Sequence, residues 1–132
     1  MSGSLIFSGA SKGGNSTTKP SETFTGEVFV DSIHRDDKVG IATVTFTPCA
    51  RSFWHTHEQG QVLKVVAGSG WICDKGDKAR RIKAGDVIYA RAGTTHWHGA
   101  DDGSILIHTA IGLGKTTWLN EVTDDEYKQR FD

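Results

Sequence analysis

Short runs of β-branched and aromatic residues alternate with turn residues along most of the chain. The clearest run is 39–46, Val-Gly-Ile-Ala-Thr-Val-Thr-Phe, and residues of this kind favour β-strands. The predicted strands are 24–33, 39–46, 52–57, 61–67, 71–74, 79–82, 87–90 and 105–111, with turns at 68–70, 75–77 and 84–86. Some eight to ten short strands separated by turns are typical of an all-β barrel or sandwich.

The two ends of the chain carry different patterns. Residues 1–22 are rich in Ser, Gly, Thr and Lys and can bury little apolar surface, so we expect a flexible N-terminal arm. The folded domain is expected to span residues 23–132. Near the C-terminus, Thr123-Asp-Asp-Glu126 has the spacing of a capping box, which predicts a short helix that continues to about Arg130.

The composition argues against several classes of partner. The chain has 132 residues, which suits one domain, and its 15 basic residues nearly balance 16 acidic ones, so nothing points to nucleic acid. No apolar run approaches the roughly 20 residues that cross a bilayer, and the N-terminus lacks the features of a signal peptide. Its two cysteines, Cys49 and Cys73, do not make a disulfide framework. We therefore expect a cytoplasmic protein that binds a small-molecule substrate.

Two pairs of histidines carry the candidate chemistry. His55 and His57 lie two residues apart, and side chains at that spacing in a β-strand point to the same face. Gln61 keeps the same parity, and His96 and His98 form a second pair with the same spacing. Imidazoles and an amide oxygen that converge inside a small β-protein can bind a divalent metal ion.

These residues resemble the two sequence motifs of the cupin superfamily. The first motif, G-x5-H-x-H-x3/4-E-x6-G, corresponds to residues 49–68, and the second, G-x5-P-x-G-x2-H-x3-N, corresponds to residues 85–100. Spacing is preserved throughout, and four positions differ in residue type: Cys49 for Gly, Gln61 for Glu, Arg91 for Pro and Ala100 for Asn. The resemblance implies a single-domain cupin, a jelly-roll β-barrel.

A closer resemblance covers nearly the whole folded chain. Segments 54–61, 96–99 and 108–111 are similar to the manganese-dependent hydroxynitrile lyases of the cupin type. In those lyases three His and one Gln bind the metal, which by position implies His55, His57, Gln61 and His96 here. Mixed nitrogen and oxygen ligands suit Mn²⁺ or Fe²⁺, with Zn²⁺, Co²⁺ and Ni²⁺ as alternatives by affinity. The chain departs from those lyases at Gly112, where they carry Gln.

Two further histidines are candidates for proton transfer. His98 shares parity with His96, and His108 interrupts an apolar run. Either can act as a general base, because an unperturbed imidazole titrates at about pH 6.5. The alternatives are a hydrogen-bonded core histidine for both and an extra metal ligand for His98. The residues expected to line the substrate pocket are Ala42, Val44, Phe46, Phe53 and Trp97.

Three functions remain open from the sequence. The first is a lyase that cleaves or forms cyanohydrins. The second is an Fe²⁺-dependent dioxygenase, or an isomerase or cyclase, that acts on a small chelating substrate. The third is a cupin that only binds a small ligand.

The sequence also predicts assembly. Val62, Val66 and Ile88 occupy outward strand positions, where they would form an apolar patch on a monomer. We expect a homodimer, with a homotetramer as the alternative, and an N-terminal arm that crosses the interface.

Overall fold

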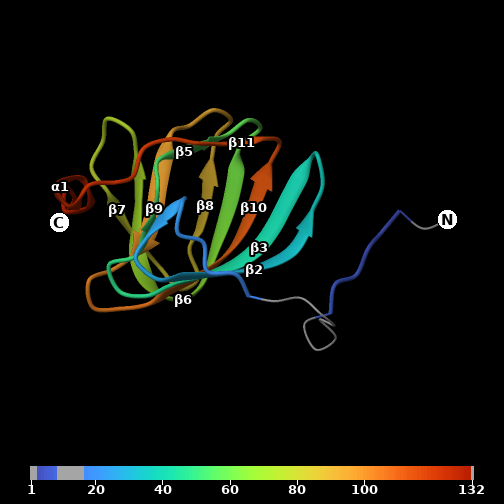
Figure 1. The fold of residues 1–132 in the computed structure, drawn as a ribbon, viewed down its shortest axis with the longest axis horizontal. Coiled ribbons are helices and arrows are strands. Elements are labelled where there is room, and N and C mark those ends of the chain that lie inside the picture. Colours follow the sequence, from blue (N-terminus) through green and yellow to red (C-terminus); the bar gives the residue numbers. More distant parts are fainter. Residues whose placement is uncertain (1–2, 9–16, 132) are drawn as a thin grey trace.

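We describe the fold from a computed structural model, in which residues 3–8 and 17–131 are described. Within these residues the chain forms eleven strands and one short helix (Figure 1). The elements are β1 (Phe24–Thr25), β2 (Val28–Arg35), β3 (Val39–Phe46), β4 (Arg51–Ser52), β5 (His55–His57), β6 (Gln61–Asp74), β7 (Arg80–Lys83), β8 (Val87–Ala90), β9 (His96–Ala100), β10 (Leu106–Leu113), β11 (Thr116–Trp118) and α1 (Asp124–Tyr127). The predicted all-β barrel is confirmed.

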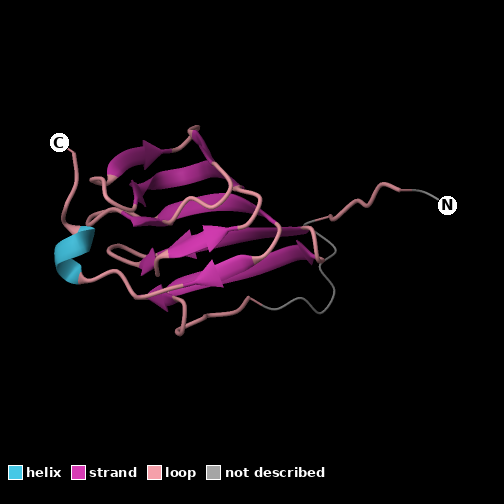
Figure 2. Ribbon diagram, turned by 90° about the horizontal axis from the view of Figure 1, so that it is seen from above, coloured by secondary structure: helices cyan, strands magenta, loops and turns pink. Residues whose placement is uncertain are grey.

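The strands pair antiparallel in the order β1-β4-β9-β6-β10-β3-β2. Strand β6 joins the two halves of the barrel, since its first half pairs with β10 and β8 and its second half with β7 and β9. Outside this path, β5 pairs with both β9 and β11. Seen from above, the strands curve around a common interior, and α1 lies at the end of the molecule away from the N-terminus (Figure 2).

The predicted turn at residues 68–70 is wrong, because β6 continues through it. Gly68 has a φ of +77°, and a Cβ there would collide with the carbonyl group of Ile105. A Cβ on Gly70 would likewise collide with the carbonyl oxygen of Gly99. These glycines therefore let β6 pass close to its neighbours as it crosses between the two halves of the barrel.

Other strands also differ from the prediction. The predicted strand 24–33 divides into β1 and β2 at Gly26, whose φ is +82°, and the two pieces pair with different strands. The predicted strand 52–57 likewise divides into β4 and β5. Strand β11 was not predicted, and it pairs with the strand that carries His55 and His57.

The predictions for the two ends of the chain have different outcomes. The capping box is confirmed, since Thr123 Oγ1 accepts a hydrogen bond from the Glu126 N–H and Glu126 Oε1 accepts one from the Thr123 N–H. The helix ends at Tyr127, earlier than predicted. Of the predicted N-terminal arm, residues 1–2 and 9–16 lie outside the described residues. Thr18 pairs with Val30 through two backbone hydrogen bonds, so the end of the arm adds to β2.

The buried apolar residues form two clusters. One fills the floor of the barrel, with Val28, Phe46, Leu63 and Leu106 fully buried. The other holds three tryptophans against α1, and its members are Trp54, Trp71, Cys73, Ala79, Trp97, Val122 and Tyr127. The first cluster supports the strands beneath the histidines, and the second attaches the C-terminal segment.

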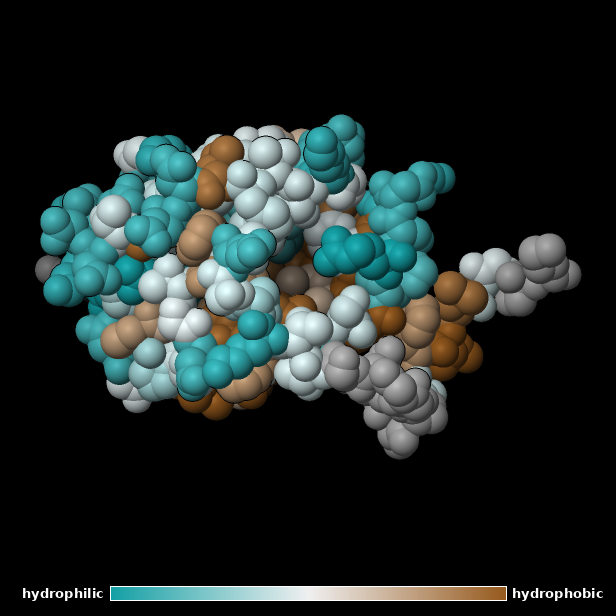
Figure 3. All heavy atoms as spheres, viewed as in Figure 1, coloured by the Kyte–Doolittle hydropathy of each residue, from teal (hydrophilic) through white to brown (hydrophobic). Residues whose placement is uncertain are grey.

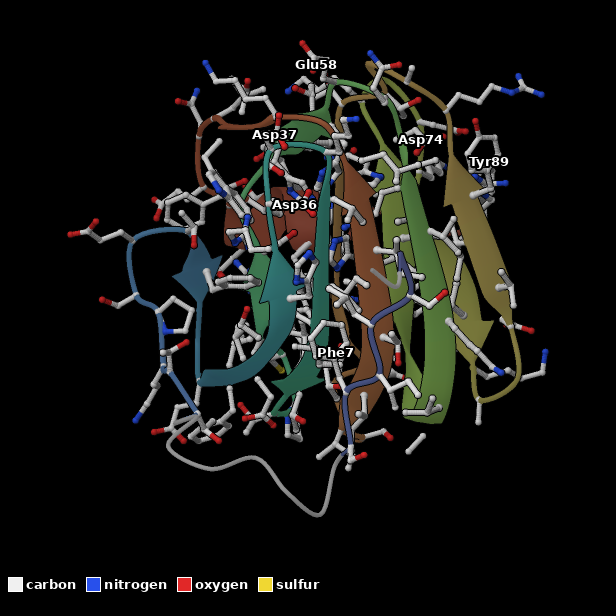
Figure 4. All side chains as sticks on the ribbon, turned by 90° about the vertical axis from the view of Figure 1, so that its right-hand side faces the viewer. Phe7, Asp36, Asp37, Glu58, Asp74 and Tyr89 are labelled. Atoms are coloured by element: carbon white, nitrogen blue, oxygen red, sulfur yellow. The ribbon has the colours of Figure 1, made fainter. Side chains whose placement is uncertain are left out.

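The outer face of β6 and β8 is partly apolar. Val66 is 50% exposed, and Tyr89 of β8 is 63% exposed on the outer side of the barrel (Figure 4). Val62 is partly buried. The predicted outward position of Ile88 is wrong, because Ile88 pairs with the buried Leu63 and packs against the core cluster. The predicted homodimer stays a prediction. In the described part of the chain, no helix is both long enough and apolar enough to cross a membrane.

The backbone at Ala50 passes close to Gly99, which leads to a prediction about stability. A Cβ added there would lie 2.5 Å from the carbonyl oxygen of Ala50, whereas one added at Gly103 would meet nothing within 4 Å. We expect Gly99→Ala to lower the free energy of unfolding by about 1–3 kcal/mol, since overpacking forces the backbone to shift. Gly103→Ala is the matched control and should change it little. Urea unfolding measures both, and equal stabilities for the two variants would contradict this packing.

Candidate metal centre

Four strands bring six polar side chains to the inside of the barrel. Strand β5 supplies His55 and His57, and β9 supplies His96 and His98. His55 and His96 are direct partners across the β5–β9 pair. Gln61 from the start of β6 and His108 from β10 complete the set, and all six side chains are buried.

Three of the histidine rings lie close enough to share one cation. His55 Nε2 and His96 Nε2 are 3.1 Å apart. One ring nitrogen from each of His55, His96 and His98 lies within 4.8 Å of the others, which makes these three a group able to hold a metal ion. The His57 ring centre lies 5.0 Å from that of His55 and 5.8 Å from that of His96. The structure therefore brings the four predicted ligands into one region and adds His98 to it.

Hydrogen bonds behind the rings fix their orientation. The His55 Nδ1–H donates to the carbonyl oxygen of Phe53 at 2.8 Å, which leaves Nε2 as a lone-pair donor. His57 Nδ1 bonds to the Thr116 hydroxyl at 3.0 Å. Outer partners of this kind commonly orient metal-binding histidines. Sequence reasoning missed Thr116 because it missed β11, and its only signal was a short run of Thr and Trp after the turn glycine Gly114.

Several buried polar atoms in this region lack a hydrogen-bond partner in the described structure. They include His57 Nε2 and Gln61 Oε1, together with the unbonded ring nitrogens His96 Nδ1, His98 Nε2 and His108 Nδ1. Buried polar atoms are nearly always hydrogen-bonded, so a cluster of orphaned atoms needs an explanation. Neutral imidazole nitrogens and an amide oxygen are suitable ligands for a divalent first-row metal, which accounts for the orphaned atoms that face the cavity.

Burial keeps the imidazoles of this cluster neutral. It lowers the pKa of His57 to about 4, of His96 to about 3 and of His108 to about 4. The pKa values of His55 and His98 are also lowered well below their usual range, first by burial and then by neighbouring histidines. Neutral rings have the free lone pairs that metal binding and proton acceptance both need.

His98 and His108 form a coupled pair. His108 Nε2 and His98 Nδ1 are 3.1 Å apart, so one hydrogen is shared between these two nitrogens. Phe46 packs against both rings, with ring centres 5.8 Å from His98 and 5.2 Å from His108. Because Phe46 is fully buried, its ring limits the movement of both imidazoles.

A cavity of about 320 Å³ opens above the histidines. Ala42 and Val44 line it, as expected, together with His55, His57, Gln61, His98 and His108. Residues of β1 and β2, the two ends of the sheet path, also line it. Figure 3 shows the corresponding face hollowed near its middle, with apolar residues inside and hydrophilic residues at the rim.

Three of the expected pocket residues do not line this cavity. Phe46 is fully buried in the core cluster instead. Trp97 stands between two inward histidines, so strand alternation turns it to the opposite face, where it packs in the tryptophan cluster. Phe53 contributes its carbonyl oxygen to His55 but not its ring to the cavity. The strand alternation that pairs His96 with His98 was sufficient to place Trp97 correctly.

The fold agrees with comparisons to known proteins. The family model that describes the cupin domain matches residues 42–109 of this chain. The chain belongs to the cupin family. Among solved structures, a cupin-like protein of Thermotoga maritima has a TM-score of 0.81 at 36% identity and covers 86% of this chain and 92% of its own.

Two curated proteins are similar to this cupin in sequence. An (R)-mandelonitrile lyase of Granulicella tundricola is 39% identical over 117 residues, which cover 83% of this chain and 89% of the lyase. An acireductone dioxygenase of Gluconacetobacter diazotrophicus is 27% identical over 99 residues, which cover 71% of this chain and 55% of the dioxygenase.

Because these histidines are buried and neutral, we expect acid to destabilise the metal-free cupin. Because these pKa values are lower in the folded chain than the usual 6.5, the unfolded chain binds more protons between about pH 6.5 and pH 4. The stabilising contribution is therefore complete above pH 6.5 and is lost as the pH falls toward 4. Urea unfolding of chelator-treated protein should show a lower free energy at pH 5 than at pH 7. Equal values would contradict the burial of neutral rings.

Proposed function

We propose that this chain is a divalent-metal-dependent lyase that cleaves small cyanohydrins to a carbonyl compound and hydrogen cyanide. The observation that carries the proposal is the buried cluster of neutral donors below a small cavity. The identity to a mandelonitrile lyase over most of both chains supports the choice of reaction. Both curated relatives are named as enzymes, which supports a catalytic role.

In this proposal His55, His57, Gln61 and His96 hold the ion. Mn²⁺ is the expected ion, and Fe²⁺, Zn²⁺, Co²⁺ and Ni²⁺ are the alternatives. A bound divalent ion supplies a Lewis acid that stabilises negative charge on a substrate oxygen. All four ligands are uncharged, so none of them reduces the positive charge that the substrate meets.

The paired histidines provide a proton acceptor. A cyanohydrin loses its hydroxyl proton as the bond between its carbon and the cyanide carbon breaks, and the electron pair of that bond leaves with cyanide. A neutral ring of His98 or His108 accepts the proton through its unbonded nitrogen, and the shared hydrogen passes between the rings. The imidazolium then returns the proton to cyanide, which leaves as hydrogen cyanide.

The walls of the cavity restrict the substrate. Ala42 and Val44 are small, so they leave room above His108, whereas the fully buried Phe46 packs against the rings of His98 and His108. A volume of about 320 Å³ suits a molecule of roughly the size of a short aliphatic or single-ring cyanohydrin. The apolar walls also limit access of water to the paired histidines.

A dioxygenase is the second candidate, because the acireductone dioxygenase is also similar in sequence. Histidine ligands with open positions can hold Fe²⁺ and admit both oxygen and a chelating substrate. Oxygen uptake by the Fe²⁺-loaded protein with diketones and catechols distinguishes this candidate from a lyase, whose reaction consumes no oxygen.

The lyase proposal predicts that the Mn²⁺-loaded protein cleaves (R)-mandelonitrile above the uncatalysed rate. His108→Gln should reduce kcat by about 100-fold or more, because general base catalysis contributes roughly 10²–10⁴-fold. Benzaldehyde release, followed by its absorbance, measures both rates.

His34→Gln is the matched control for this substitution. His34 bonds to Asp36 outside the buried cluster, so its replacement should leave the rate nearly unchanged. Elemental analysis must show equal metal content in the variants. Absence of turnover above background in the Mn²⁺-loaded wild type would remove the lyase proposal.

A further inference from the structure

A row of four residues crosses the inner face of the barrel at its open end. Arg35 of β2 lies opposite Gly40 of β3, Gly40 lies opposite Gly112 of β10, and Gly112 lies opposite Gln61 of β6. Directly paired residues in a sheet point to the same face, and all four line the cavity. Two positions without side chains therefore lie between the arginine and the glutamine.

A β-bulge turns Arg35 toward the cavity. The register of β2 against β3 shifts between Ser32 and His34, so that Ser32 pairs with Ala42 and Arg35 pairs with Gly40. In a regular strand without a bulge, alternation from Ser32 would point His34 inward and Arg35 outward. Bulges often re-aim a side chain next to an active site, and this one brings a cation to the cavity.

Because Gly40 and Gly112 have no side chains, the side chains of Arg35 and His57 can lie close over these strands. A Cβ on Gly40 would lie 3.4 Å from Arg35 Nη1, so the guanidinium lies over that glycine. A Cβ on Gly112 would lie 3.1 Å from His57 Nδ1, so that imidazole lies over the next strand. Neighbouring strands are about 4.8 Å apart, which is the scale of a few carbon–carbon bonds.

Arg35 is a cation without an acidic partner among the described residues. By contrast, Arg51, Arg80, Arg81 and Arg130 each pair with an aspartate. Asp36 is the other charged side chain that lines the cavity. Its Oδ1 accepts the N–H groups of Lys38 and Val39, and its Oδ2 bonds to His34 Nε2, so both oxygens are bonded to partners other than Arg35.

Other acidic side chains lie near this end of the barrel but outside the cavity lining. Figure 4 shows Asp36, Asp37 and Glu58 at the same end of the strands, toward the loops. Arg35 and Asp36 both line the cavity, but no ion pair joins them in the described part of the chain. A small anion would supply the missing partner of Arg35.

We propose that Arg35 binds a carboxylate of the substrate, so that the substrate is a small carboxylic acid with its reacting oxygen a few bonds from the carboxylate. The planar guanidinium can bind such a group through two parallel hydrogen bonds. The position of the reacting oxygen near the metal rests on the proposed lyase function. The carboxylate is inferred independently, from the row of residues between Arg35 and Gln61.

Ligand binding tests this inference independently of turnover. The probes are 4-oxobutanoate and its methyl ester, which share one carbon chain and differ in charge. Calorimetry with the Mn²⁺-loaded full chain should show the carboxylate binding about tenfold more tightly than the ester, as expected for a charge-assisted hydrogen bond. Arg35→Gln should reduce this preference to less than about twofold.

Arg91→Gln is the matched control. Arg91 is also exposed and without an ion pair in the described structure, but it does not line the cavity. It should retain the full preference, and all three proteins should have the same metal content and melting temperature. The inference is overturned if the wild type binds the ester as tightly as the carboxylate, if it binds neither, or if Arg35→Gln keeps the preference.

The outcomes also separate this inference from the lyase proposal. Mandelonitrile cleavage without a carboxylate preference would overturn the role of Arg35 and leave the reaction standing. A carboxylate preference that depends on Arg35, without cyanohydrin cleavage, would support the binding site and remove the lyase.

Discussion

The interior of this barrel is organised around polar groups that are buried without partners. Five imidazoles and one amide are removed from water, and several of their nitrogen and oxygen atoms have no hydrogen bond in the described structure. Such atoms cost free energy unless something binds them. The strands bring one ring nitrogen from each of His55, His96 and His98 within 4.8 Å of the others, a spacing at which three side chains can hold a metal ion.

Side-chain size then shapes the space above that point. Moving from the floor to the rim between β3 and β10, the paired inward residues are Phe46 with Leu106, Val44 with His108, Ala42 with Ala110, and Gly40 with Gly112. The walls thus recede toward the opening. This gradient explains how a chain of 132 residues encloses a cavity and still keeps a fully buried core beneath it.

Much of this arrangement could be predicted from local patterns. The i, i+2 spacing of His55 and His57 and of His96 and His98 places each pair on one face, because strand geometry is periodic. The capping box at Thr123 is a short-range signal and was read correctly, although the helix stops at Tyr127. His108 was recognised as an inward polar residue in an apolar strand, and it lines the cavity.

Features that depend on distant strands could not be predicted in the same way. The glycines at 68 and 70 indicated a turn, but they serve close contacts with segments more than 25 residues away. Strand β11 is too short to show alternation, and only its pairing with β5 defines it. The bulge at 33 reverses the direction of Arg35, and no local pattern marks it, because a bulge is defined by the register of the neighbouring strand.

The most direct test of this account is the position of the metal ion in crystals grown with Mn²⁺. Diffraction data collected on both sides of the manganese absorption edge locate the ion by its anomalous scattering. The account predicts one peak in the barrel, within bonding distance of His55, His57, Gln61 and His96. A peak held by His55, His96 and His98 without Gln61, or no peak within the cavity, would contradict it.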